Sequence, residues 1–179
     1  MALVDMSRKL KPWNQYLQPT QYIHPRASAV NKLTIKNDKL CYNDVECKDV
    51  LPAEEGISKL KKYLYKNFPN GVTLIAHNGD NFDFPLLRRD WIKYSKSLDK
   101  NYCIHCVDSI SLFKRQFPSL GRYNQPYLLE RFLGSENIES EHEAIGDCIN
   151  LRSAIEAAAK EKNISLAEFL SIPGRPLYI

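Results

Sequence analysis

Near the middle of the chain stands the sequence Val72-Thr73-Leu74-Ile75-Ala76-His77-Asn78-Gly79-Asp80-Asn81-Phe82-Asp83-Phe84-Pro85-Leu86-Leu87. Its first five residues are apolar and partly β-branched, which predicts a buried strand. The polar residues 77–81 are typical of a turn, and Pro85 is placed where the first turn of a helix tolerates proline. In open α/β sheets, ligands bind at the carboxyl ends of the strands. We therefore expect Asp83 to lie in a ligand-binding crevice.

The same region carries a family resemblance. Residues 76–87, Ala-His-Asn-Gly-Asp-Asn-Phe-Asp-Phe-Pro-Leu-Leu, resemble the second motif of the DEDDh 3′→5′ exonucleases. They are most similar to the three-prime repair exonucleases, in which a His-Asn-Gly-Asp turn precedes an aromatic residue, an Asp and Phe-Pro-Leu-Leu. Twelve nearly contiguous matching positions are a far more specific signal than an isolated glycine-rich motif. The resemblance implies that Asp83 is a catalytic metal ligand.

A second match lies near the carboxyl end of the chain. The spacing His142-x₄-Asp147 resembles the third DEDDh motif, in which the histidine is the general base and the aspartate a metal ligand. Hydrolysis by two divalent metals needs converging carboxylates, and oxygen ligands suit Mg²⁺ or Mn²⁺. A base with a pKa near neutrality, such as histidine, completes such a site. The resemblance thus implies catalytic roles for Asp83, His142 and Asp147.

Helix geometry constrains this third motif. Five helical positions at about 100° each would leave His142 and Asp147 roughly 140° apart around one helix. We therefore expect His142 in the preceding loop or at the helix N-cap, with Asp147 one turn into the helix. The alternative is an ordinary surface histidine, followed by an aspartate that the helix dipole favours. The matching order of the motifs along the chain favours the exonuclease interpretation.

Three further residues are candidates for substrate binding. The segment from Ile23 to Thr34 resembles the family segment between the third strand and the first helix, and there Val30 would pack on the terminal base. The alternative for Val30 is a place in a short core turn. Asn78 and Phe82 would line the 3′-terminal nucleotide, and an aromatic side chain suits this role because base stacking tolerates any sequence.

The family's first motif, an Asp-x-Glu on the first strand, has no counterpart upstream of the predicted hairpin. The chain is thus expected to begin at the family's second strand and to be N-terminally incomplete. Three explanations remain open: a truncated product or gene model, a strand supplied by another chain, or a degenerate domain that binds without cleaving. Two carboxylates alone are a weak site for Mg²⁺, which requires nearly octahedral geometry.

The pattern along the chain predicts a single α/β domain over residues 1–179. Strands are expected at 2–6 and 13–17, paired as a hairpin, at 72–76 and at 104–108, where Asp108 or Ser109 caps a following helix. Helices are expected at 52–67, 84–94, 125–133 and 142–160, and a capping box opens a short helix at Ser165. By resemblance, the fold is ribonuclease H-like, with a mixed central sheet that is flanked by helices and lacks the usual first strand.

Composition sets broader limits. The 179 residues carry a net charge of +4, a mild basic bias that is compatible with nucleic acid. The sequence shows no apolar run of about 18 residues and no signal peptide, so we expect neither a membrane span nor secretion. Five cysteines in such a chain indicate reduced thiols in the cytoplasm or nucleus. A zinc site at Cys103 and Cys106 is disfavoured, because no second pair of ligands has a suitable spacing.

Together, the resemblance implies a 3′→5′ exodeoxyribonuclease domain acting on single-stranded or frayed DNA 3′ ends, with Mg²⁺ or Mn²⁺ as cofactor and a homodimer as the expected assembly. The alternative is a catalytically deficient nucleic-acid-binding or scaffold module. A ribonuclease of the same superfamily is a weaker third hypothesis, since preference for the 2′-hydroxyl cannot be predicted here.

Overall fold

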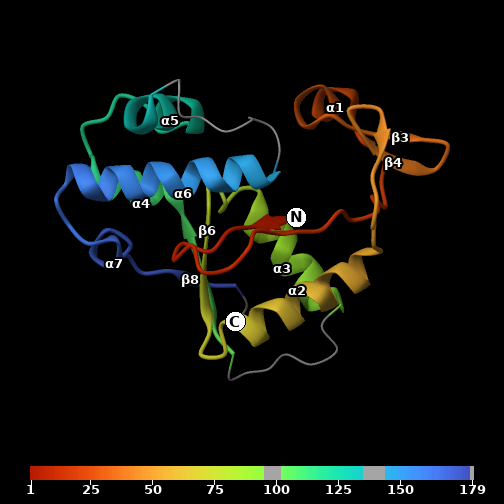
Figure 1. Ribbon diagram of the computed structural model, residues 1–179, viewed down its shortest axis with the longest axis horizontal. Coiled ribbons are helices and arrows are strands. Elements are labelled where there is room, and N and C mark those ends of the chain that lie inside the picture. Colours follow the sequence, from red (N-terminus) through yellow and green to blue (C-terminus); the bar gives the residue numbers. More distant parts are fainter. Residues whose placement is uncertain (95–101, 135–143, 178–179) are drawn as a thin grey trace.

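Two parallel strands lie at the centre of the computed structural model, in which residues 1–94, 102–134 and 144–177 are described (Figure 1). β6 (Val72–Ala76) pairs with β7 (Ile104–Asp108) over all five positions, from Val72 opposite Ile104 to Ala76 opposite Asp108. The short β8 (Arg175–Pro176) is antiparallel to β7, which gives a mixed sheet in the order β6-β7-β8. Both predicted strands are confirmed.

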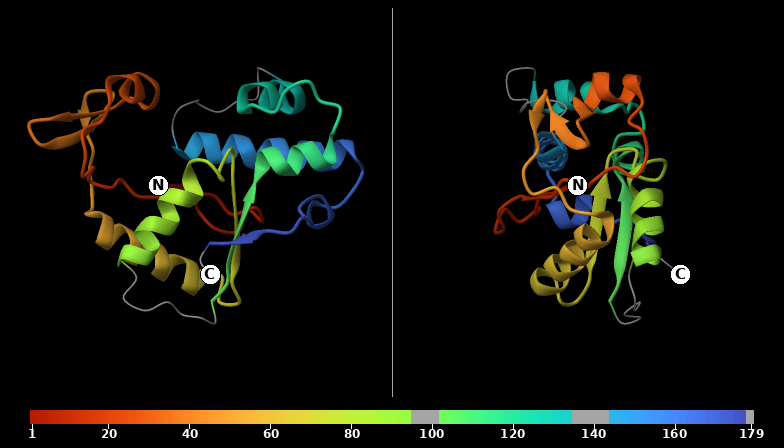
Figure 2. Two further views of the ribbon diagram at one scale, coloured as in Figure 1. Left: turned by 180° about the vertical axis from the view of Figure 1, so that it is seen from behind. Right: turned by 90° about the vertical axis from the view of Figure 1, so that its right-hand side faces the viewer.

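Alternate side chains along these strands point to opposite faces of the sheet and pack into two separate hydrophobic cores. Ile104 and Cys106 of β7 belong to one cluster, which α2 (Ala53–Asn67) and α3 (Asp83–Tyr94) complete with side chains such as Leu60 and Trp91. Val107 points the other way, into a cluster built with the later helices. These are α4 (Ser109–Gln116), α5 (Gln125–Leu133), α6 (Ala144–Glu161) and α7 (Leu166–Phe169). Helices thus cover both faces of the strand pair (Figure 2).

The helix predictions hold closely within the described residues. α2 begins one residue after Pro52, α5 ends at Gly134 with a positive φ, and Ser165 caps α7 by accepting a hydrogen bond from the Glu168 amide. The side chain of Asp108 caps α4, as one of the two predicted alternatives. The predicted start of the 142–160 helix, with His142, lies outside the described residues.

The predicted N-terminal hairpin is confirmed but is much shorter than expected. β1 (Ala2–Leu3) pairs antiparallel with β2 (Trp13–Asn14). The expected strand over residues 2–6 stops early because the carboxylate of Asp5 accepts hydrogen bonds from the amides of Ser7, Lys9 and Leu10, which bends the chain into a turn. Within the described ranges, this hairpin forms a sheet of its own and does not join β6.

Residues 18–50 form an arm that stands to one side of the sheet in Figures 1 and 2. It consists of α1 (Pro25–Asn31) and a meander of β3 (Leu33–Lys36), β4 (Lys39–Tyr42) and β5 (Val45–Glu46). Its two ends meet where Leu17 bridges to Leu51. α1 buries no residue, and Val30 is 59% exposed. The alternative that placed Val30 in a core turn is therefore wrong.

The architecture is mixed α/β with small sheets, as the sequence predicts at that level. No helix in the described part of the chain combines the length and the apolar character needed to cross a membrane.

Candidate active site

The turn that follows β6 is held in a narrowly defined shape. Asn78 takes a positive φ of 54°, and its side-chain oxygen accepts a hydrogen bond from Asn81 Nδ2 at 2.7 Å. A Cβ at Gly79 would lie 2.6 Å from the ring of Phe84 and 2.8 Å from the Ala76 side chain, so only glycine fits there. The carbonyl of Gly79 also accepts the Phe84 amide at 2.9 Å. Packing against the first turn of α3 thus fixes where the turn presents its side chains.

Side chains at the end of β7 tie this turn to its neighbour. Asp108 Oδ2 accepts the Asp80 amide at 3.2 Å, while Oδ1 accepts the Ile110 amide at 2.8 Å. One ring nitrogen of His77, Nδ1, lies 2.9 Å from Ser109 Oγ. Because Ala76 and Asp108 are opposite each other in the parallel register, the turn after β6 and the start of α4 lie at the same edge of the sheet. Asp108 therefore has a structural role, as its sequence position predicts.

A third connection comes from the carboxyl-terminal strand. Arg175 of β8 forms an ion pair with Asp80 at 3.3 Å. The arginine side chain is 76% exposed and the aspartate side chain 28% exposed. Exposed pairs of this kind contribute at most about 1 kcal/mol, so this one adds to the bonds of Asp108 rather than replacing them.

Asp83 is the first residue of α3 and is exposed. Crowding by neighbouring groups partly desolvates its carboxyl and raises its pKa above the usual value. The nearby Asp108 carboxylate adds to this rise, and a backbone hydrogen bond opposes it. The carboxyl group thus faces solvent beside a second negative charge, where a cation would be favoured.

Asp147 lies in the first turn of α6, where the helix dipole places a partial positive charge. Its carbonyl oxygen accepts a hydrogen bond from Gln125 Nε2 at 3.3 Å. Burial raises the pKa of the adjacent Cys148 thiol to about 11, and the carboxylates of Asp147 and Asp83 both contribute to that rise. Two elements far apart in the sequence therefore bring Asp83 and Asp147 within electrostatic range of the same thiol.

The described residues do not by themselves make a complete metal site. Within residues 1–94, 102–134 and 144–177, no three His, Cys, Asp or Glu side chains gather closely enough to hold an ion. The oxygen chemistry of Asp83 and Asp147 suits Mg²⁺ or Mn²⁺, but two carboxylates alone do not fill the octahedral coordination that Mg²⁺ requires. The expected base, His142, lies outside the described residues.

The substrate residues predicted from sequence are divided by the fold. Asn78 and Phe82 share the turn with Asp83, and Phe82 is 62% exposed and available for stacking. Val30 lies in α1, on the separate arm. The site-building roles of His77, Asp80 and Arg175 were not predicted. The available signal was the pair of equally long strands, of which the first is followed by a polar turn and the second by a helix N-cap.

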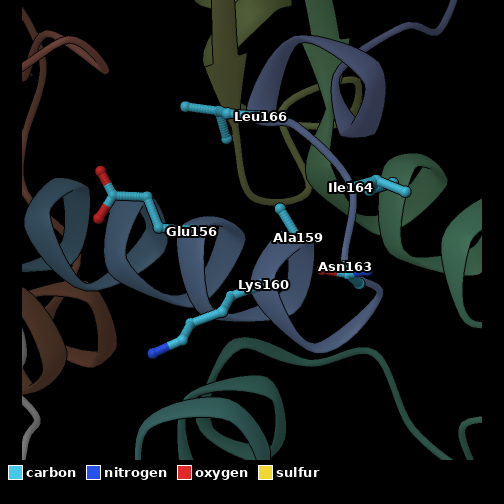
Figure 3. Close-up of a pocket in the computed structure, with 6 residues that line it drawn as sticks. All are labelled: Glu156, Ala159, Lys160, Asn163, Ile164 and Leu166. Atoms are coloured by element: carbon cyan, nitrogen blue, oxygen red, sulfur yellow. The ribbon is translucent and has the colours of Figure 1, made fainter.

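Two surface hollows lie elsewhere on the described part of the chain. One of about 370 Å³ is bounded by α6 and the residues leading to α7 (Figure 3), and its lining consists of Glu156, Ala159, Lys160, Asn163, Ile164 and Leu166. A second, of about 750 Å³, lies along α2 near Leu51 and Lys62. Neither contains a predicted site residue, so the candidate active site is an exposed edge of the sheet.

Comparisons with known proteins give a likeness of fold. No protein-family model matches the chain, and no curated protein does. Among solved structures, the chain is similar to "Exonuclease X in complex with 5' overhanging duplex DNA", with a TM-score of 0.53 and 15% sequence identity. That match covers 93% of this chain and 83% of the other. The chain therefore has an exonuclease-like fold.

Proposed function

We propose that this protein is a metal-dependent 3′→5′ exonuclease domain acting on DNA 3′ ends, with a ribonuclease H-like fold of the DEDDh and three-prime repair type. The observation that carries the proposal is the exposed Asp83, presented by a braced turn at the sheet edge and sharing the surroundings of Cys148 with Asp147. The exonuclease-like fold supports it. Single-stranded or frayed ends are the proposed substrate.

In this proposal the side chains have distinct roles. Asp83 and Asp147 supply carboxylate oxygens to Mg²⁺ or Mn²⁺, which when bound stabilises the charge that develops on the phosphate. His142 takes the proton from the attacking water. Phe82 stacks on the terminal base, Asn78 donates to the same nucleotide, and Val30 of the arm packs against that base if the arm meets the substrate.

The second candidate function is a nucleic-acid-binding or scaffold module without cleavage. It is favoured by one observation: across the described ranges, no group of three metal-binding side chains forms. The exonuclease proposal accordingly requires that further ligand oxygens come from a partner chain or from residues outside those ranges. A homodimer, part of the family resemblance, is one such assembly.

The deciding experiment is digestion of a 5′-labelled single-stranded DNA by the 179-residue chain in Mg²⁺. We expect a ladder of products shortened from the 3′ end. Asp147→Ala is the test variant, and Glu130→Ala, at an exposed position of α5, is a carboxylate control that should leave the ladder unchanged.

An unchanged ladder with Asp147→Ala would contradict the assigned site. No ladder from the wild-type protein, with retained DNA binding, would support the binding module instead.

A further inference from the structure

The outer face of α3 carries a row of side chains that continues from Phe82 and that the active-site proposal otherwise does not use. α3 buries Phe84 and Trp91 against the core and holds Leu87 and Tyr94 half-buried beside them. At about 100° per residue, the opposite side of the helix carries Leu86, Arg89 and Lys93, continuous with Phe82 just before the helix. These four residues, here called the α3 outer stripe, are Phe82, Leu86, Arg89 and Lys93.

The α3 outer stripe is exposed over its whole length. Phe82 and Leu86 are 62% and 53% exposed, and the Arg89 side chain is 65% exposed. Ile92, at the margin of the stripe, is 52% exposed. Large apolar side chains that are this exposed and adjacent to one another mark a binding surface more often than isolated ones do.

Charge along the stripe changes in a defined direction. The end next to Asp83 is apolar, and the far end is cationic, with Arg89, Lys93 and the neighbouring Arg88. Arg89 Nε lies 2.8 Å from Asp90 Oδ1, but this is a pair between adjacent residues and leaves the guanidinium largely in water. Lys93 Nζ lies over the Tyr94 ring at 4.9 Å from its centroid. Both cations can therefore meet an anion from solvent.

We propose that the α3 outer stripe is the track along which a single DNA strand runs away from the active site, a proposal that rests on the proposed function. Phe82 and Leu86 contact the bases nearest the 3′ end, and Arg89 and Lys93 contact phosphates further along. From Asp83 to Lys93 the helix rises about 15 Å. At about 3.4 Å per phosphate along one strand, this length spans about four nucleotides.

Charge argues against a second copy of the chain as the occupant. In a two-fold interface the same patch meets itself, and the four residues of the α3 outer stripe include no acid that could pair with the cations of the other copy. A phosphate backbone has the complementary charge, and the stripe begins at the residue proposed to stack on the terminal base.

The test measures binding separately from cleavage. An oligothymidylate of about eight nucleotides with a 5′ fluorophore is titrated in EDTA over a range of salt concentrations. The test variant is Arg89→Glu/Lys93→Glu, and Lys114→Glu/Lys160→Glu, on α4 and the far end of α6, makes the same change in net charge. Arg89→Gln/Lys93→Gln serves if charge reversal prevents folding.

We expect the stripe variant to weaken binding at least about tenfold more than the control variant does. The slope of log affinity against log salt should become shallower by about 1.4, at about 0.7 per lost phosphate contact on a single strand. In Mg²⁺, kcat/KM should be higher for the longer strand than for a dinucleotide, and this difference should be smaller for the stripe variant than for the wild-type chain.

Equal losses in the two variants would overturn the track while leaving the nuclease intact. Stripe-dependent binding without any cleavage by the wild-type chain would support the track and contradict the proposed function. No binding by the wild-type chain overturns the track. A change in sedimentation of the free protein on stripe substitution would assign the face to self-association and overturn it as well.

Discussion

The two parallel strands, β6 and β7, lead into similar local structures that have different roles. β6 and β7 each have five residues, run in register, and are followed by a helix that begins at or beside an aspartate. The turn of residues 77–82 separates β6 from α3, whereas β7 leads directly into α4. Asp108, after β7, is 7% exposed and accepts two backbone amides. Asp83, after β6, is exposed at the start of α3. One carboxylate is occupied by the fold, and the other is free to meet a ligand.

The difference teaches how the fold prepares a site. The bonds that Asp108 makes to the Asp80 amide, together with the contact of His77 with Ser109, hold the neighbouring turn rigid. These hydrogen bonds compensate for the conformational cost of the positive φ at Asn78, so ligand binding does not have to. The buried Asp108 after β7 thus helps to orient the exposed Asp83 after β6.

The largest effect is expected for the exposed acid. Asp83→Ala should abolish nuclease activity while changing the free energy of unfolding by no more than about 0.5 kcal/mol, because an exposed side chain is removed. Product ladders and chemical denaturation measure the two quantities. A loss of unfolding free energy as large as that caused by Asp108→Ala would contradict the proposed difference between Asp83 and Asp108.

Asp108→Ala should behave in the opposite way. It removes the N-cap of α4 and leaves the partly buried Asp80 amide without its acceptor, which together should cost about 2 kcal/mol of unfolding free energy. Asp108→Asn should retain part of this stability, because its amide oxygen can accept one of the two bonds. If urea denaturation showed wild-type stability for Asp108→Ala, the bracing role would be refuted.

Gly79→Ala tests the close packing of the turn that follows β6. The added methyl would overlap the Phe84 ring and the Ala76 side chain, so we expect a loss of about 1–3 kcal/mol. Gly121→Ala is the matched control, since a Cβ there meets nothing within 4 Å. Thermal denaturation compares them, and equal midpoints would contradict the close packing of the turn.

His77 should give the bracing a modest pH dependence. Burial lowers its pKa below the usual 6.5, with the Asp108 charge acting in opposition. The unfolded chain therefore binds more protons than the folded one in the window below about pH 6.5, so stability should rise with pH through that window and level off above it. His77→Gln should flatten this part of the curve. An unchanged curve would assign the dependence to other groups.

The smallest effect is expected at Cys103, just before β7. The residue is exposed and its thiol is free, so Cys103→Ser should leave activity unchanged and shift the unfolding free energy by no more than about 0.5 kcal/mol. A large loss of either would point to a structural or metal-binding role for this cysteine. Zinc analysis of the purified protein is the matching measurement.

Residue pattern determined much of this protein by itself. The apolar run at 72–76, the turn at 77–82 and the helix with Pro85 follow from local preferences, as does the cap at Asp108. Helix 125–133 ends at Gly134 because that glycine takes a positive φ. Such features depend on neighbours along the chain, and therefore the sequence is enough to place them.

Only the tertiary structure decided which residues meet. The carboxylate of Asp5 ends β1 early by capturing nearby amides, although its neighbours favour a strand. Arg175 reaches Asp80, and Asp147 joins Asp83 around Cys148, across separations in sequence that no periodicity encodes. The physical reason is that these contacts depend on parallel pairing and helix packing, which are set by burial of the whole core.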